Sequence, residues 1–231
     1  MHRRHSLTLA AGIVIGFGFL VSGDADSAGG QTVAGGVVHA DAPAPTPLVV
    51  DEDVDFCGNK GLLSEQYQVS SSGGLGNVIV YIEGLSGTPE SKTYSLSNDG
   101  CRYEPHVLAV GVGSTLKVDN ADPILHNTHA RYRSQDAFNL ALPMQDQVID
   151  VTISEAGIMK VGCDAGHSWM SGWIAAFDHP WFAVTDADGR FSISDVPAGE
   201  HTLVWWHEKL GKRTRTITVA DAALDLDLGF E

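Results

Sequence analysis

The chain has 231 residues and a formal net charge of −15, so it is long enough for one sizeable hydrophobic core or two small ones. An acidic surface repels the phosphates of nucleic acids and of anionic lipids, and we therefore exclude both classes as expected partners. The charge favours solubility, or a cationic protein partner.

Residues 1–28 have the pattern of an export signal. A basic start, MHRRHS, is followed by fifteen apolar or small residues, LTLAAGIVIGFGFLV, and then by a small, polar exit. The apolar run is short and rich in glycine for a membrane-spanning helix. We therefore expect cleavage and a periplasmic or secreted protein with no membrane contact beyond this signal; an uncleaved anchor is the alternative.

The remainder of the chain shows the period-two alternation of half-buried strands, as in LKVD and VIDVTI. No stretch keeps a helical period over three turns, so the predicted class is all-β, a sandwich or barrel. Strands are expected at 31–38, 76–85, 106–112, 114–120, 147–153, 157–163 and 172–177, and in three patterns within 181–220. ADAPAPTP is a connector, and the segment 48–74 is expected to be irregular, with short strands at 48–50 and 66–70.

Three cysteines in an exported chain leave one cysteine without an intramolecular partner, because oxidising compartments normally pair them. Cys57 and Cys101 lie in polar, loop-like settings, DFCGNKG and NDGCRYE. Cys163 instead follows an apolar strand and precedes a histidine and a methionine. We predict a disulfide between Cys57 and Cys101 and a free Cys163 thiolate; a bridge that uses Cys163 is the alternative.

The segment VGCDAGHSWMSGW places a thiol, an imidazole and a thioether within eight residues, at Cys163, His167 and Met170. Such soft and borderline donors suit copper in both oxidation states. Upstream, GSTLKVDNADPILHNTHA predicts a strand that ends at Asn120 and a short loop that carries His126. If both loops lie at the same end of a sandwich, their donors can converge on one ion.

These segments resemble the cupredoxin family, which includes the plastocyanin-like and amicyanin-like mononuclear copper proteins. The resemblance spans about residues 94–177 and rests on a G-x-T-x-x-x-x-N strand before His-Asn and on the closing C…H…M-x-G-x-I pattern. It implies a Greek-key β-sandwich that holds one copper ion, with His126, Cys163 and His167 as equatorial ligands and Met170 as the axial ligand. It also implies that Asn127 ties the two loops together by hydrogen bonds near the sulfur.

The spacing between the cysteine and the histidine departs from the plastocyanin and amicyanin pattern. Those proteins have two residues there, whereas this chain has three, Asp-Ala-Gly. The longer spacing occurs in dinuclear copper A loops, but such a site needs another cysteine where this chain has Met159. We therefore expect a mononuclear site. Zinc is the main competing metal, and a packed free thiol beside an incidental histidine and methionine is the remaining alternative.

Three more residues are predicted to support the metal site. His129 follows His126 by three positions, and His106 lies in the segment leading into the site, so both are expected behind the ligands rather than on a second metal. Trp169 lies between two proposed ligands and is expected to shield the metal or to form a docking face. Ordinary hydrogen-bonded imidazoles and ordinary core packing are the alternatives.

The segment FAVTDADGRFSISDVPAGEHTLVWWHEKLG resembles the carboxypeptidase regulatory-like domain, a small transthyretin-like β-sandwich. DADG and PAGE are predicted hairpin turns, and DADG lacks the bidentate glutamate of a calcium loop. QTVAGGVV and NVIVYIEG would supply the first strands of this module. We predict N-terminal strands and a linker at 29–93, a copper domain at 94–177 inserted into this second sandwich, and the sandwich's closing segment at 178–231. One cupredoxin with long decorations is the alternative.

Together these patterns predict an exported copper protein that carries single electrons and is not an enzyme. A four-ligand site leaves no open position for a substrate, and the chain lacks the histidine pairs of a second copper site. The expected partner is a redox protein such as a cytochrome c, a copper reductase or a periplasmic dehydrogenase. Copper delivery or storage is one rival function, and an interaction module with a structural metal is another.

Overall fold

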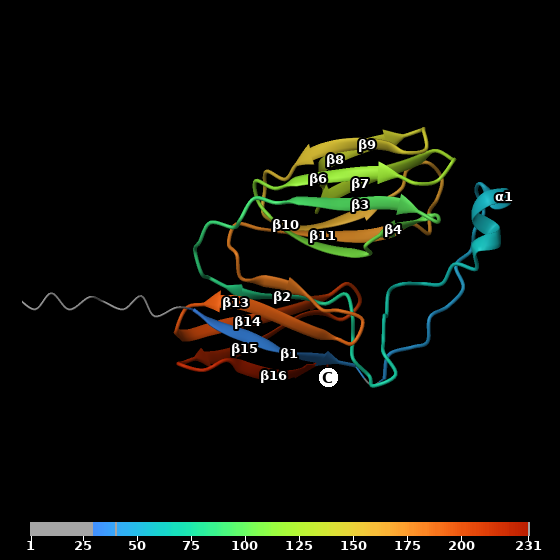
Figure 1. Ribbon diagram of the computed structural model, residues 1–231. Coiled ribbons are helices and arrows are strands. Elements are labelled where there is room, and N and C mark those ends of the chain that lie inside the picture. The colour runs from blue at the N-terminus through green and yellow to red at the C-terminus, as the bar shows by residue number, and fades with distance from the viewer. Residues whose placement is uncertain (1–29, 40, 231) are drawn as a thin grey trace, which may run out of the picture.

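The computed structural model describes residues 30–39 and 41–230, and the predicted export signal at 1–28 lies outside this range. Nearly all regular structure in the described residues is β-strand, which confirms the predicted all-β class. Within these residues, no helix is both long enough and apolar enough to cross a membrane. The strands form four sheets that pack as two sandwiches (Figure 1).

The outer sandwich combines strands from the two ends of the described chain. Its sheets have the orders β13-β1-β16 and β12-β2-β14-β15. Alternate apolar side chains from both sheets, among them Val33, Ile82 and Ile193, bury one common core. The strands are β1 (Gln31–Val38), β2 (Ile79–Glu83), β12 (Phe182–Val184), β13 (Arg190–Val196), β14 (Gly199–His207), β15 (Gly211–Val219) and β16 (Leu224–Gly229).

The inner sandwich is formed by the strands between β2 and β12. Its sheets have the orders β4-β3-β6-β9 and β5-β11-β10-β7-β8, and they share a second core that includes Leu116, Val161 and Ile174. The strands are β3 (Thr93–Asp99), β4 (Arg102–Glu104), β5 (Val107–Gly111), β6 (Thr115–Asn120), β7 (His126–Tyr132), β8 (Gln135–Leu142), β9 (Gln147–Thr152), β10 (Gly157–Gly162) and β11 (Ser171–Phe177).

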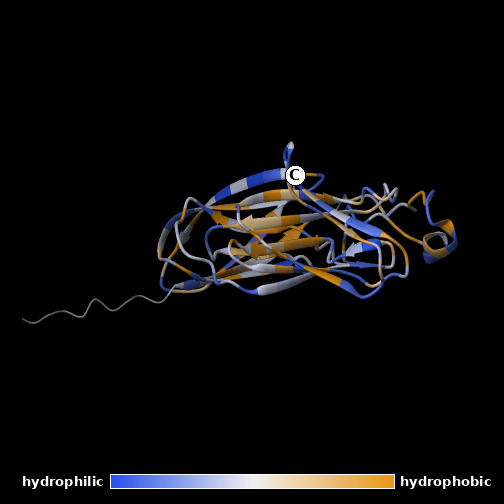
Figure 2. Ribbon diagram, turned by 90° about the horizontal axis from the view of Figure 1, so that it is seen from above, coloured by the Kyte–Doolittle hydropathy of each residue, from blue (hydrophilic) through white to orange (hydrophobic). Residues whose placement is uncertain are grey.

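A third apolar cluster joins the two sandwiches. Val107 and Phe177 of the inner sandwich pack with Ile79, Phe182 and Trp206 of the outer one. The rings of Phe177 and Phe182 stack with centroids 4.7 Å apart. Figure 2 shows apolar segments along the strands in the middle of the molecule. The shared cluster and the stacked rings fix the inner sandwich against the outer one.

The segment between β1 and β2 leaves the outer sandwich and reaches the end of the inner one. We call residues 48–62 the arm; it contains the single-turn α1 (Val54–Cys57) and the 3-10 turn η1 (Gly58–Lys60), and in Figure 1 α1 lies beside the end of the inner sandwich. The predicted disulfide is present between Cys57 and Cys101, and Cys163 is free. The disulfide fastens the arm to the turn between β3 and β4.

Several local predictions were wrong. His126 begins strand β7 and does not lie within a loop, because the polar residues at its start are buried and hydrogen-bonded in the site. The segments 48–50 and 66–70 are not strands and contribute only isolated bridges near residues 47 and 69. DADG and PAGE are not hairpins, since each connects strands of opposite sheets. The sequence also missed β3, β4, β8 and β16.

Candidate metal centre

Strand pairing brings the two predicted ligand segments together. β7 and β10 are antiparallel neighbours, with His129 opposite Gly162. The start of β7, at His126, therefore lies beside the end of β10, where the chain continues to Cys163. Because both strands belong to one sheet, the backbone on each side of the site is held by ladder hydrogen bonds.

Three predicted ligands, His126, Cys163 and His167, converge at this end of the sandwich. Their donor atoms lie within 4.8 Å of one another. The Nδ1 atoms of the two histidines are 3.1 Å apart, and Cys163 Sγ lies 3.6 Å from His167 Nδ1. Both imidazoles are 0% exposed, and the thiol is half-buried. A thiol and two imidazoles thus face one small buried volume.

The outer nitrogen of each imidazole meets a carboxylate. His126 Nε2 lies 2.9 Å from Asp122 Oδ2, and His167 Nε2 lies 2.8 Å from Asp53 Oδ2. A carboxylate only accepts hydrogen bonds, so these contacts place the ring hydrogen on Nε2 and leave Nδ1 as a lone pair. Two lone pairs 3.1 Å apart repel unless a shared proton or a metal cation lies between them. The donor set therefore fits a cation, and its softness fits copper.

The charges around His126 reinforce this arrangement. Burial alone raises the pKa of the Asp122 carboxyl, but hydrogen bonds from His126 and from the backbone N–H groups of Cys101 and Gly100 outweigh it and lower the pKa. Burial alone lowers the pKa of His126, but the neighbouring Asp122 and Cys163 outweigh it and raise the pKa. Both shifts show an environment that attracts positive charge to the imidazole pair.

Asn127 connects the two ligand segments, the role that the cupredoxin resemblance implies for it. Its backbone N–H donates to Cys163 Sγ at 3.3 Å, and its side-chain Oδ1 accepts from the backbone N–H of Asp164 at 3.1 Å. Tyr103, which is fully buried, donates its hydroxyl to the Asn127 carbonyl at 2.5 Å. Burial raises the pKa of the Tyr103 phenol, so it stays a donor. These bonds hold the sulfur in place without a metal.

Asn120 shapes the connection that leads to His126. Its side-chain amide donates to the carbonyls of Ile124 and Leu142 at 2.8 and 2.9 Å. Its Oδ1 accepts from the backbone N–H of Asp122 at 3.0 Å. One buried side chain therefore fixes both the turn and the aspartate that holds His126.

Met170 and Trp169 lie close to these ligands. Met170 is buried within the inner core cluster, which Cys163 and Trp169 also contact. Its backbone N–H donates to the His167 carbonyl at 2.9 Å. Residues 163–170, which we call the ligand loop, therefore form a tight turn there. The centroids of the Trp169 and His167 rings are 5.1 Å apart. Trp169 therefore covers one side of an imidazole ligand.

The two predicted supporting histidines have different positions. The ring of His129 is held between Asp164, at 2.6 Å, and Asp136, at 2.7 Å, so it contacts the residue that follows Cys163. His106 lies 2.5 Å from Glu208 of the outer sandwich. His129 thus borders the ligand loop, whereas His106 helps to join the two sandwiches.

Sequence reasoning missed the two carboxylates behind the imidazoles. Asp122 precedes His126 by four residues in an Asn-Ala-Asp-Pro turn, which is a weak signal for a hydrogen-bonded loop. Asp53 lies 114 residues from His167 along the chain, and its local sequence carries no signal for this contact. The sulfur of Cys101 also lies near Asp122 and His126, but the disulfide makes it unavailable as a thiolate ligand.

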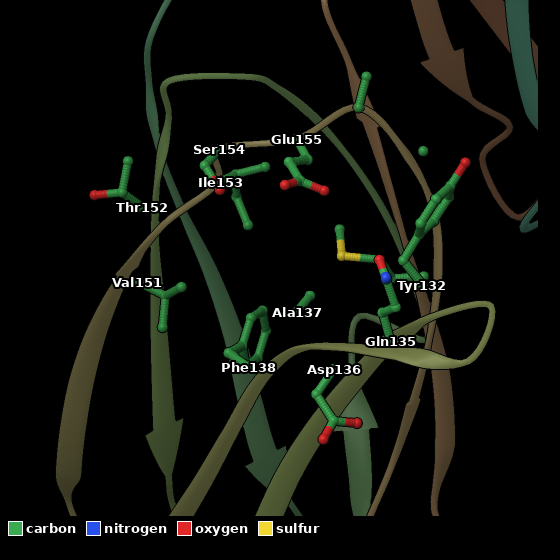
Figure 3. Close-up of a pocket in the computed structure, with 13 residues that line it drawn as sticks. Tyr132, Gln135, Asp136, Ala137, Phe138, Val151, Thr152, Ile153, Ser154 and Glu155 are labelled. Carbon is green, nitrogen blue, oxygen red and sulfur yellow. The ribbon is translucent and has the colours of Figure 1, made fainter.

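A separate cavity of about 240 Å³ lies at the opposite end of the inner sandwich, beyond the end of β7 (Figure 3). Tyr132, Phe138, Ile153 and Glu155 are among its lining residues, and none of the predicted ligands contributes to the lining. The cluster of candidate ligands is therefore not part of this cavity.

The chain matches no protein-family model and no curated protein. Several solved structures of copper proteins align with part of it. A purple cupredoxin from Nitrosopumilus maritimus is 22% identical, with 36% of this chain and 99% of that chain covered, at a TM-score of 0.32. An oxidised amicyanin variant is 25% identical, with coverages of 42% and 98%, at a TM-score of 0.33. A reduced, Cu(I) amicyanin variant is 24% identical, with the same coverages and a TM-score of 0.32. The carboxypeptidase regulatory-like resemblance stays a prediction.

Proposed function

We propose that this protein binds one copper ion through His126, Cys163 and His167, with Met170 as a weaker fourth donor, and that it carries single electrons. The observation that carries the proposal is the convergence of a free thiol with two imidazole Nδ1 atoms, which lie 3.1 Å apart. When bound, copper supplies a one-electron couple, and this donor set suits both of its oxidation states.

The surroundings of the ligands favour electron transfer. The sulfur accepts a hydrogen bond from Asn127, and each imidazole is held on its outer nitrogen by a carboxylate. Ligands that are held in place before metal binding have little need to move when charge changes. Two buried imidazoles among four donors also leave no position for a substrate, so we propose a carrier and not an enzyme.

The proposed setting is outside the cytoplasm. A disulfide such as Cys57–Cys101 persists in oxidising compartments, and the predicted export signal leads to the same place. The net charge of −15 would favour a redox partner with a cationic docking face, through electrostatic steering. A cytochrome c, a copper reductase or a periplasmic dehydrogenase meets the chemical requirement.

Copper reconstitution of the purified protein tests this function. We expect one copper per chain, an intense thiolate-to-copper band in the visible spectrum, a matching paramagnetic resonance signal and reversible one-electron reduction. Cys163→Ser abolishes the band, and His126→Gln weakens copper binding. His201→Gln is the matched control, because His201 lies on β14 of the outer sandwich and contacts the Pro197 carbonyl.

Three results would overturn the proposal. Preference for zinc without any thiolate-to-copper band would make the metal structural. Rapid loss of Cu(I) to a competing chelator, without stable redox cycling, would indicate copper delivery or storage. Normal partner binding by the metal-free protein, with no change on copper loading, would indicate an interaction module.

A further inference from the structure

The arm covers the second imidazole ligand. His167 is 0% exposed, and its outer nitrogen lies 2.8 Å from the carboxylate of Asp53, which the arm carries. The Asp53 side chain itself is 39% exposed, so it forms the boundary between the buried imidazole and solvent. This contact shields the Nε2 edge of the His167 ring from solvent.

The arm packs on the ligand loop at more than this one contact. Leu48, Val50 and Phe56 surround the disulfide in one apolar cluster with Trp169. A Cβ placed on Gly166, next to the His167 ligand, would lie 3.0 Å from Glu52 Cγ. Gly166 also has a φ of +96°, a conformation that favours glycine. The arm and the ligand loop therefore pack closely against each other.

The turn at Cys101 organises both carboxylates. Its backbone N–H and that of Gly100 donate to Asp122 at 2.8 and 2.9 Å, and Asp122 holds His126. Its carbonyl accepts from Trp169 Nε1 at 3.1 Å. Its sulfur is bonded to Cys57, four residues after Asp53. The turn at Cys101 is thus bonded to Asp122 directly, and the disulfide links it to the segment that carries Asp53. Both carboxylates behind the imidazole ligands are connected to this one turn.

The backbone conformation of Asp53 suits its position beside His167. Asp53 has a φ of 45° and lies at the N-terminal end of α1, a left-handed conformation that aspartate and asparagine adopt more readily than most residues. Its carbonyl accepts from the backbone N–H groups of Phe56 and Cys57 at 3.0 and 2.9 Å. The turn therefore aims the side chain at His167 while its backbone is held by the helix.

We propose that Asp53 is a positioning residue of the metal centre: its carboxylate fixes the His167 ring and strengthens that ligand's donation to the metal. This inference rests on the proposed copper function. A carboxylate on the outer nitrogen of a metal-binding imidazole fixes its tautomer and raises its basicity, and its negative charge stabilises Cu(II) more than Cu(I). The arm, through its disulfide, keeps this carboxylate in place.

Asp53→Asn removes the charge and keeps the turn, since asparagine also adopts positive φ. We expect Cu(II) affinity to fall about 10- to 100-fold, with a much smaller change in Cu(I) affinity. The reduction potential then rises by about 59 mV for each tenfold change in the affinity ratio of a one-electron couple. Asp55→Asn is the matched control: it removes the same charge from the same arm, and we expect less than a twofold change.

A second readout needs no metal. In the metal-free wild type, nitrogen NMR of the His167 ring should show the hydrogen on Nε2, in slow exchange with solvent. Asp53→Asn should speed this exchange at least tenfold, whereas Asp55→Asn should not. Asp53→Gly, which also accepts a positive φ, should behave like Asp53→Asn and guards against an effect of the amide itself.

The outcomes separate the two proposals. If the wild type binds no copper, the proposed function fails, while the imidazole exchange still tests Asp53. If copper binds but Asp53→Asn and Asp55→Asn shift the potential equally, only general charge acts and the role of Asp53 is refuted. Unchanged exchange of the His167 ring in both Asp53 variants would refute it as well.

Discussion

Asn120→Ala tests how the fold builds the first ligand's position. Asn120 is fully buried at the end of β6. Its side chain satisfies the carbonyls of Ile124 and Leu142 and the N–H of Asp122. The substitution leaves these three backbone groups without their partner, in a place where water reaches them poorly.

The expected cost follows from those three hydrogen bonds. Each contributes about 0.5–1.5 kcal/mol net, and a buried group left unsatisfied costs more. We therefore expect Asn120→Ala to lower the free energy of unfolding of the inner sandwich by roughly 3 kcal/mol. This is a large fraction of the stability of a small domain.

Urea denaturation of the metal-free protein measures this change, and amide hydrogen exchange in β6 and β7 assigns it to the inner sandwich. Asn59→Ala is the matched control, because Asn59 is exposed and donates only to the Asp55 carbonyl at 3.3 Å; we expect a change within about 0.5 kcal/mol. A loss below about 1 kcal/mol in Asn120→Ala would contradict the role assigned to these bonds.

Two further predictions concern the disulfide and the outer sandwich. Replacing Cys57 and Cys101 together with alanine opens a loop with a sequence separation of 44 and should cost up to about 4 kcal/mol of unfolding free energy. Urea denaturation measures this cost, and no loss would show that the disulfide adds nothing to stability. Burial lowers the pKa of His207 to about 4, below its unfolded value of about 6.5, so the unfolded state binds the extra proton between these values. Stability that is present above pH 6.5 should therefore be lost as the pH falls toward 4, by up to about 1.4 kcal/mol per pH unit. The His207→Gln variant should lose less stability over the same range. Equal losses in the two proteins would contradict the assignment of this pH dependence to His207.

Much of the candidate site could be predicted from local sequence. The settings of the three cysteines indicated which one stays free, and the spacing of Cys163, His167 and Met170 indicated a ligand loop. The position of His126 was found as well, but its strand was not. HNTHARY reads as a polar loop, because alternation cannot show that polar side chains are buried against hydrogen-bonding partners.

The supporting contacts could not be predicted in this way. Asp53 reaches His167 across 114 residues, and only the disulfide and the packing of the arm place it there. Strand β16, with the sequence LDLDLG, was missed, and its parallel pairing with β1 depends on the assembled sheet. Long-range contacts of this kind are set by tertiary packing, and local periodicity does not specify them.

X-ray absorption at the copper edge of the reconstituted protein tests the central claim most directly. We expect one copper per chain with one short sulfur bond and two imidazole nitrogens, and loss of the short sulfur bond in Cys163→Ser. A coordination sphere without sulfur in the wild type, or one unchanged in Cys163→Ser, would show that these three side chains do not form the metal centre.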